Sequence, residues 1–192
     1  MKILVCGGAG FIGSAFIRNY LNNHQNDIIL NLDSLTIGSN LKNLKGIEQN
    51  QNYQFFKDDI KNQDTVNKLV NDVDTIINFA AESHVDRSIA NPKPFIETNI
   101  LGTFSLLEAA KKFEKLFIHV STDEVYGDAE DSESFTEKSL IKPSNPYSAT
   151  KASSDHLVAA YHRTYKIKCI TTRCTNNFGP FQFPEKLIPK TI

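Results

Sequence analysis

The chain opens with Ile3-Leu4-Val5-Cys6-Gly7-Gly8-Ala9-Gly10-Phe11-Ile12-Gly13, an apolar run that passes directly into glycines with GxxGxxG spacing. A short apolar run bounded by glycine predicts a buried strand, and residues 11–22 have the spacing of a helix. The alternation continues: it predicts strands at 28–32, 53–56, 75–79, 116–120 and 167–172, and helices at 65–70, 94–112 and 146–165. Strands rich in Ile, Leu and Val that alternate with helices predict a parallel α/β sheet, doubly wound, with helices on both faces.

Length and composition limit the number of domains and the classes of function. The 192 residues suffice for one substantial core, so we expect one domain at 1–178. The turn at Gly179-Pro180 breaks the pattern, and we assign 179–192 to the start of a second, substrate-binding region that is largely absent. A net charge of −1 with no basic block gives no electrostatic case for nucleic acid or a membrane surface.

The sequence also indicates a cellular compartment. No run approaches the roughly 18 apolar residues of a membrane span, and the N-terminal apolar stretch is too short for a secretory signal. The three cysteines are odd in number and lack the spacing of a metal site, which favours reduced thiols. We therefore expect a cytoplasmic protein without a bound metal.

The glycine-rich stretch has the features of a Rossmann-type cofactor loop. Gly7 would allow a tight turn, Gly10 a close approach of the backbone to a pyrophosphate, and Gly13 close packing of the helix. Asp33 ends the next predicted strand, about 20 residues further along, where a carboxylate accepts hydrogen bonds from ribose hydroxyls and repels a 2′-phosphate. The motif therefore favours NAD over NADP; the alternative is a structural turn followed by a surface carboxylate.

Tyr147 and Lys151 are a candidate catalytic pair. They are four residues apart on a predicted helix, so their side chains share a face. A neighbouring ammonium is expected to lower the pKa of the phenol from about 10, so that it can take a proton from a sugar hydroxyl as hydride leaves for NAD. Ser121 and Thr122, at the end of the fifth strand, could link substrate to Tyr147. The alternative is a surface helix pair.

Asp123 and Glu124 follow directly and are a candidate acid and base. Adjacent carboxyl groups in different environments can have separated pKa values, with one protonated and one ionised. The alternative is a pair of capping residues at the start of a helix.

Five segments together resemble the extended short-chain dehydrogenase/reductase family, and within it the nucleotide-sugar 4,6-dehydratases. The similarity extends along the whole chain. The segments are Gly7-Gly8-Ala9-Gly10-Phe11-Ile12-Gly13-Ser14, Ala80-Ala81-Glu82-Ser83-His84-Val85-Asp86-Arg87-Ser88-Ile89, Ser121-Thr122-Asp123-Glu124-Val125-Tyr126-Gly127, Asn145-Pro146-Tyr147-Ser148-Ala149-Thr150-Lys151-Ala152-Ser153-Ser154-Asp155-His156 and Asn176-Asn177-Phe178-Gly179-Pro180.

The resemblance implies an NAD-dependent lyase that acts on dTDP-glucose, with UDP-glucose as the alternative. Thr122, Tyr147 and Lys151 would oxidise C4 of the glucose, Glu124 would remove the C5 proton, and Asp123 would protonate the departing C6 hydroxyl. Return of hydride to C6 would give a 4-keto-6-deoxy sugar. The resemblance also implies a homodimer formed through the helices at 94–112 and 146–165.

The resemblance assigns further residues to the binding of cofactor and substrate. A non-catalytic NAD-binding fragment remains an alternative; a 4-epimerase is disfavoured, because epimerisation needs no Asp123-Glu124 pair. The cofactor residues are Gly7, Gly10, Phe11, Ile12, Gly13, Asp33, Ser34, Leu35, Thr36, Asp59, Ile60, Ala80, Ala81, Ser83, Thr98, Tyr147, Lys151 and Asn177; the substrate residues are His84, Thr122, Asn176, Lys186 and Leu187.

Overall fold

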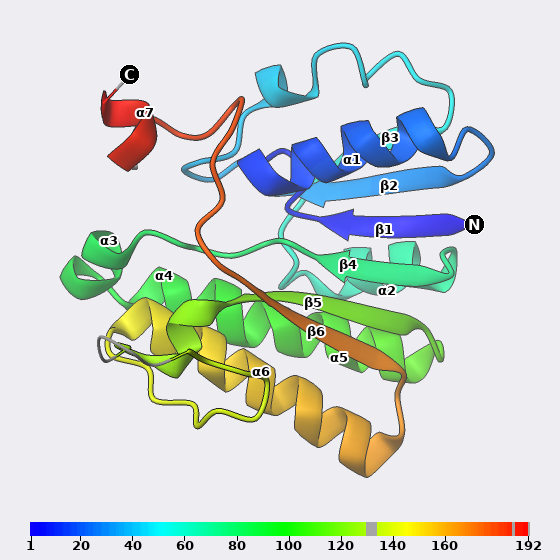
Figure 1. Ribbon diagram of the computed structural model, residues 1–192. Coiled ribbons are helices and arrows are strands. Elements are labelled where there is room, and N and C mark those ends of the chain that lie inside the picture. The colour runs from blue at the N-terminus through cyan, green and yellow to red at the C-terminus, as the bar shows by residue number, and fades with distance from the viewer. Residues whose placement is uncertain (130–133, 186, 192) are drawn as a thin grey trace.

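A six-stranded parallel sheet forms the centre of the described chain (Figure 1). The structure is a computed structural model and describes residues 1–129, 134–185 and 187–191. The strand order is β3-β2-β1-β4-β5-β6, so the order reverses beside β1. All the predicted strands are confirmed, with ends shifted by at most two residues: β1 Lys2–Cys6, β2 Ile28–Asp33, β3 Tyr53–Lys57, β4 Thr75–Asn78, β5 Leu116–Thr122 and β6 Cys169–Cys174.

The helices that link the strands lie close to the predicted positions. The helix predicted at 94–112 is a continuous path in three segments, α4, η2 and α5, and η2 has π-helical geometry, which apolar spacing alone does not distinguish from an α-helix. The short helices α3 and α7 were not predicted. The helical segments are α1 Phe11–Asn23, η1 Leu41–Leu44, α2 Gln63–Asn71, α3 Val85–Ala90, α4 Lys93–Phe95, η2 Ile96–Gly102, α5 Thr103–Lys112, η3 Asp123–Tyr126, α6 Pro146–Tyr165 and α7 Leu187–Thr191.

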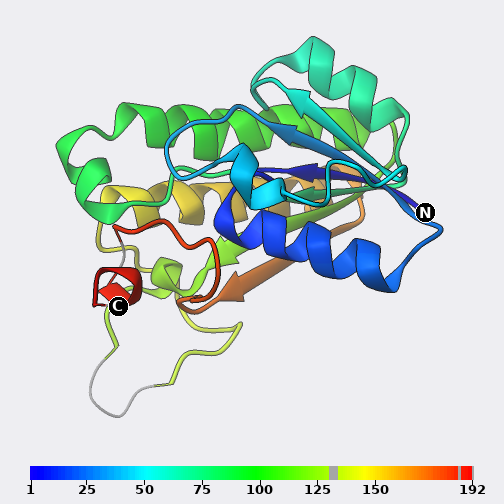
Figure 2. The same ribbon diagram turned by 90° about the horizontal axis from the view of Figure 1, so that it is seen from above.

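Alternate residues of the strands supply two cores, one on each face of the sheet. On β1, Ile3 and Val5 pack with α1, whereas Leu4 and Cys6 pack into the core under α2, α5 and α6. Figure 2 shows α1 on one side of the sheet and α5 and α6 on the other. At the β6 edge the side facing α1 is open among the described residues, and Ile170 there is 50% exposed.

The carboxyl ends of the strands all point to one edge of the sheet, where the connecting loops gather. Both α3 and α7 lie at this edge (Figure 1). In this class of fold, ligands bind beyond the carboxyl ends of the strands, beside the point where the strand order reverses. None of the helices in the described part of the chain is long and apolar enough to cross a membrane.

Candidate functional site

The turn between β1 and α1 requires glycine at two positions. Gly7 has a φ of +78°, and a Cβ there would lie 2.5 Å from the backbone nitrogen of Ala80. A Cβ on Gly13 would lie 2.3 Å from the carbonyl oxygen of Gly7. Neither backbone atom can move aside, so these glycines set the tight turn and the close approach of α1 that we predicted for them.

Gly10 differs from both, because the protein leaves space beside it. A Cβ there would contact only the Gly7 carbonyl oxygen, at 3.3 Å, and Gly10 is the N-cap of α1 without a side-chain cap. The first N–H groups of a helix have no intrahelical acceptor and attract an anion. The open side of Gly10 at this terminus fits a pyrophosphate held against the backbone.

Two asparagines that we did not predict stabilise this turn through hydrogen bonds to its backbone. Asn31 is fully buried in β2 and accepts the Gly8 N–H at 3.1 Å, and Asn43 donates to the Ala9 carbonyl at 2.9 Å. The polar Asn31 inside an otherwise apolar strand was the available sequence signal, since a buried amide needs hydrogen-bond partners.

Alanine substitutions at Gly10 and Gly13 are expected to separate binding from folding. Gly13→Ala should destabilise the protein by about 1–3 kcal/mol, because the new methyl group overlaps backbone. The free energy of unfolding of Gly10→Ala should stay within about 0.5 kcal/mol of the wild-type value. This variant should nevertheless bind NAD at least 10-fold more weakly, because its methyl group occupies the space next to the helix terminus. Thermal denaturation and calorimetry measure the two effects; equal NAD affinity in Gly10→Ala and wild type would contradict the placement.

Asp33 ends β2 next to this turn and is anchored by backbone N–H groups. Its Oδ2 accepts from Ala9 at 2.9 Å and its Oδ1 from Leu35 at 2.8 Å, with the residue only 6% exposed. Leu35 adopts a φ of +57° and packs against the α1-side core. Each carboxylate oxygen retains a lone pair, so Asp33 can still accept hydrogen bonds from the hydroxyls of a ribose.

A hollow of about 440 Å³ brings together three of the predicted cofactor residues. Phe11 and Ile12 line it from the first turn of α1, and Asn177 lines it from the segment after β6. Arg18 also lines it, with its guanidinium 5.4 Å from the centre of the Phe181 ring. The aromatic rings of the segment after β6 are exposed: Phe178 is 72% exposed and Phe181 50%.

The residues predicted to be catalytic also meet, at the carboxyl end of β5. Thr122 ends β5, and its hydroxyl accepts the Glu124 N–H at 3.2 Å, which starts η3. Asn145 caps α6 in a capping box with Ser148, and its side chain also donates to Glu124 at 3.4 Å. The Glu124 carboxylate is therefore tied to the helix that carries Tyr147 and Lys151.

Tyr147 is buried against its neighbours at the start of α6. Its backbone N–H donates to the Ser88 hydroxyl at 3.1 Å, and its ring meets that of Phe95 edge-on, with centroids 6.4 Å apart. The Lys151 ammonium donates to the carbonyl of Val120 at 2.8 Å, one turn further into α6. Ser88 and Phe95, which we did not predict, thus fix the position of the phenol.

The pKa of Tyr147 is raised in this structure, whereas the sequence predicted a lowered value. Burial, and next the charge of Glu124, raise the pKa of Tyr147, and the hydrogen bond with Thr122 only partly opposes this rise. Burial lowers the pKa of Lys151 to about 8, so its ammonium is still mostly charged at neutral pH but loses its proton at mildly alkaline pH. Tyr147 is therefore a phenol at neutral pH in this structure, and further positive charge must approach it before it can act as a base.

The other predicted cofactor residues lie around the loops after β2, β3 and β4, and not all present a side chain. The Asp59 carboxylate accepts the Lys61 N–H at 2.9 Å, as a local cap would, and Ile60 is a core residue at 4% exposure. The Ala80 N–H donates to the Asn78 side chain at 3.1 Å. The remaining members are exposed or half-buried near the same loops: Ser34, Thr36, Ala81, Ser83 and Thr98.

The predicted substrate residues are less completely assembled. His84 Nε2 lies 3.6 Å from a Glu185 carboxylate oxygen, which also accepts from Arg87 at 2.7 Å. Asn176 is exposed, Leu187 is 82% exposed, and Lys186 lies outside the described residues. The contacts of Glu185, which we did not predict, tie the segment after β6 to α3.

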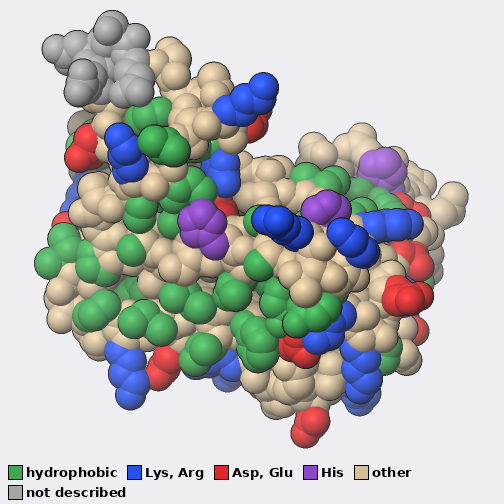
Figure 3. Space-filling model, turned by 90° about the horizontal axis from the view of Figure 1, so that it is seen from below, with side chains coloured by type: hydrophobic (Ala, Val, Ile, Leu, Met, Phe, Trp, Pro, Cys, Tyr) green, Lys and Arg blue, Asp and Glu red, His purple; other side chains and the backbone are tan. Residues whose placement is uncertain are grey.

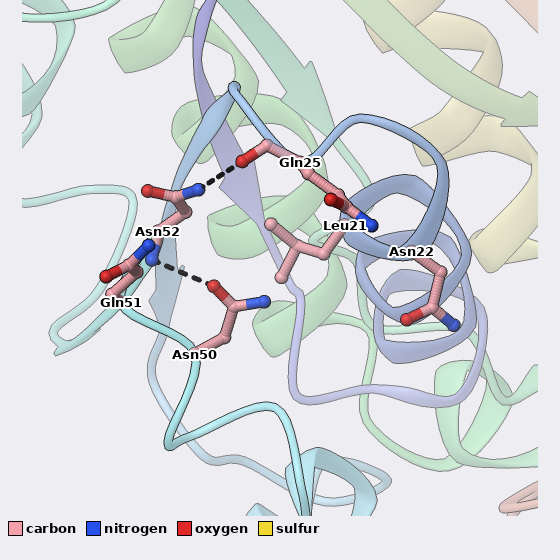
Figure 4. Close-up of a pocket in the computed structure, with 6 residues that line it drawn as sticks. All are labelled: Leu21, Asn22, Gln25, Asn50, Gln51 and Asn52. Carbon is pink, nitrogen blue, oxygen red and sulfur yellow. Dashed lines mark hydrogen bonds between the residues drawn. The ribbon is translucent and has the colours of Figure 1, made fainter.

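A second hollow, of about 310 Å³, lies at the opposite edge of the sheet. Figure 4 shows its lining, in which Asn52 donates to the Gln25 carbonyl at 2.5 Å and to the Asn50 side chain at 2.9 Å. Only amides and Leu21 line it, so it offers neither a nucleophile nor a titratable group. No predicted site residue lies there.

A doubly wound sheet that sets a Tyr-Lys helix over the end of β5, and a glycine turn over the end of β1, is the arrangement of the extended short-chain dehydrogenases/reductases. Within this class, the family model described as GDP-mannose 4,6 dehydratase matches residues 4–192, so the chain belongs to that family.

Individual relatives agree with this assignment. The chain is 49% identical to the dTDP-glucose 4,6-dehydratase of Escherichia coli over 100% of its own length and 59% of the relative's. It superposes with a TM-score of 0.95 on a dTDP-glucose 4,6-dehydratase of Streptomyces venezuelae solved with NAD, at 48% identity, covering 99% of this chain and 60% of that one. It also superposes on a UDP-glucuronic acid 4-epimerase of Bacillus cereus, likewise solved with NAD, with a TM-score of 0.92 at 35% identity. That superposition covers 98% of this chain and 61% of the epimerase. The chain thus spans about three fifths of these relatives.

Proposed function

We propose that this chain supplies the NAD-binding and catalytic part of a nucleotide-sugar 4,6-dehydratase that acts on dTDP-glucose. The observation that carries the proposal is the junction of η3 and α6, where Asn145 ties the Glu124 carboxylate to the helix of Tyr147. Exchange of hydride at one carbon needs only the tyrosine and lysine. A pair of carboxyl groups fixed beside them is what removal of water additionally requires.

The residues around the β1–α1 turn fit NAD. The open side of Gly10 and the first N–H groups of α1 would hold the pyrophosphate, and Asp33 the adenosine ribose. Phe11, Ile12 and Asn177 would line its path. When bound, NAD accepts a hydride from the sugar and later returns it, and its oxidised ring carries a positive charge.

The protein's own residues would then divide the proton transfers. Tyr147, as phenolate, takes the proton of the C4 hydroxyl, while Thr122 hydrogen-bonds to it and Lys151 contributes positive charge. The ketone at C4 acidifies C5, so Glu124 can remove the C5 proton. Asp123 donates a proton to the hydroxyl that leaves C6 as water, and Glu124 would return its proton to C5 when hydride is returned to C6. His84 and Asn176, with Lys186 and Leu187, would hold the sugar and its diphosphate.

The face formed by η2, α5 and α6 supports pairing with a second copy of the chain. Figure 3 shows hydrophobic side chains gathered on this side of the molecule. Ile96, Leu101, Phe104 and Tyr165 are each 44–51% exposed. Grouped apolar exposure of this kind marks protein interfaces, and two such helix pairs would pack as a four-helix bundle.

Cofactor choice and sugar-dependent reduction test this function. We expect calorimetry to show NAD binding at least about 10-fold tighter than NADP, because a 2′-phosphate would lie against the Asp33 carboxylate. On addition of dTDP-glucose, absorbance of reduced nicotinamide should rise and then fall. Binding of NAD without any such rise would favour the alternative, a non-catalytic NAD-binding fragment. A larger response to UDP-glucose would reassign the nucleotide.

A further inference from the structure

Four polar side chains meet under α6, behind the catalytic residues. Asp155 follows Lys151 by one helical turn, and the two residues are 4% and 3% exposed. His119 on β5 is fully buried, and Arg173 lies on the neighbouring strand β6. Both face α6, because Phe117, two residues before His119, packs into the α6-side core and Arg173 pairs in register with Ser121.

Arg173 holds Asp155 in a fixed position. Its Nε donates to Asp155 Oδ2 at 2.8 Å, and its Nη1 donates to the Tyr126 hydroxyl at 2.8 Å. The guanidinium also lies 5.1 Å from the centre of the Tyr126 ring. A buried carboxylate is retained only when it is paired, and Arg173 supplies that partner for Asp155.

The second carboxylate oxygen of Asp155, Oδ1, has no hydrogen-bond donor among the described residues. Asp155 Oδ1 and both ring nitrogens of His119 lack a hydrogen-bond partner among the described residues, and Oδ1 lies 3.6 Å from His119 Nε2. Burial, with the charges of Lys151 and Arg173, lowers the pKa of His119 well below its usual value, so this histidine is neutral. The second cation near Asp155 is therefore Lys151 and not His119.

We propose that Asp155, clamped by Arg173 one helical turn from Lys151, is a positioning residue that keeps the Lys151 ammonium charged. The protonation of Lys151 is a property of this chain itself; its consequence for catalysis rests on the proposed function. A buried lysine without a nearby anion would lose its proton, and would then contribute no positive charge to the site.

The charges that face Lys151 support this role. Burial lowers the pKa of Lys151 to about 8, and the charge of Asp155 is the largest of the effects that oppose the fall, followed by Cys174 on β6. From β5, His119 is neutral and contributes no charge, and on α6 itself Tyr147 is a phenol at neutral pH. Asp155 is thus the anion on which the charge of Lys151 chiefly depends.

Direct titration of Lys151 tests the proposal without any need for activity. The full chain is labelled with ¹³C at lysine Cε, and the Lys151 signal is assigned by its loss in Lys151→Arg. We expect it to titrate near pH 8 in the wild type and about one pH unit or more lower in Asp155→Asn. The matched control Asp64→Asn, on the exposed surface of α2, should not move it. An unchanged Lys151 titration in folded Asp155→Asn would overturn the proposal.

Arg173→Gln gives the reverse test and covers the case in which Asp155→Asn does not fold. Without the guanidinium, the charge of Asp155 acts more strongly on Lys151, so the pKa of Lys151 should rise. A lower or unchanged pKa of Lys151 in this variant would contradict the proposal. The rate of NAD reduction by dTDP-glucose should fall at alkaline pH as Lys151 loses its proton. In Asp155→Asn this fall should occur at a correspondingly lower pH. If the wild type reduces no NAD, the proposed function fails, and the titration still decides the role of Asp155.

Discussion

Tyr147→Phe is expected to lower the rate of NAD reduction by dTDP-glucose by about 10³-fold, because the protein loses the group that accepts the C4 hydroxyl proton. NAD affinity should stay within about twofold, since the phenol hydroxyl is not expected to contact the pyrophosphate or the adenosine. The lost hydrogen bond with Thr122 should cost only about 1 kcal/mol of stability. Rapid-mixing absorbance with saturating NAD and sugar nucleotide measures the rate.

The matched control for this change is Tyr165→Phe, which removes the same hydroxyl near the far end of α6, where the residue is 51% exposed. It should reduce NAD at the wild-type rate. A Tyr147→Phe rate within threefold of wild type would show that another group accepts the proton, and the assignment of Tyr147 as the base would be abandoned.

Glu124→Gln is expected to separate oxidation from removal of water. Product formation should fall by about 10³-fold, because no carboxylate remains to take the C5 proton. Oxidation at C4 should persist, so reduced nicotinamide should accumulate rather than rise and fall. The charge of Glu124 also raises the pKa of Tyr147. Its removal should therefore shift the pH dependence of NAD reduction to lower pH.

The exposed Glu48, in the turn before β3, provides the control, since Glu48→Gln should leave both steps unchanged. Normal release of dehydrated sugar by Glu124→Gln would refute the role of this residue as the base.

The sequence correctly predicted the strands and the start of α6, which depend on residues close together in the chain. Apolar runs bounded by glycine or polar residues place each strand within two residues of its observed ends, because burial on both faces of a parallel sheet leaves little choice of residue. The capping box at Asn145 likewise begins α6 where the sequence predicted. The π-helical turn of η2 was missed, since its apolar spacing resembles that of an α-helix.

Contacts between segments that are far apart in the sequence could not be predicted from local patterns. The spacing of Tyr147 and Lys151 predicts their shared face, but the raised pKa of the phenol arises from burial and from Glu124, on a different element. The pairing of Asp155 with Arg173 joins α6 to β6, and that of Arg87 with Glu185 joins α3 to the segment after β6. No local pattern marks either pair.

The most direct test of the dehydratase assignment is mass spectrometry of dTDP-glucose after incubation with this chain and NAD. We expect the sugar nucleotide to lose the mass of one water, with UDP-glucose converted more slowly. Calorimetry on the same sample confirms that NAD is bound. Recovery of dTDP-glucose and UDP-glucose at unchanged mass, with NAD bound, would contradict the assignment of this chain as a catalytically competent dehydratase.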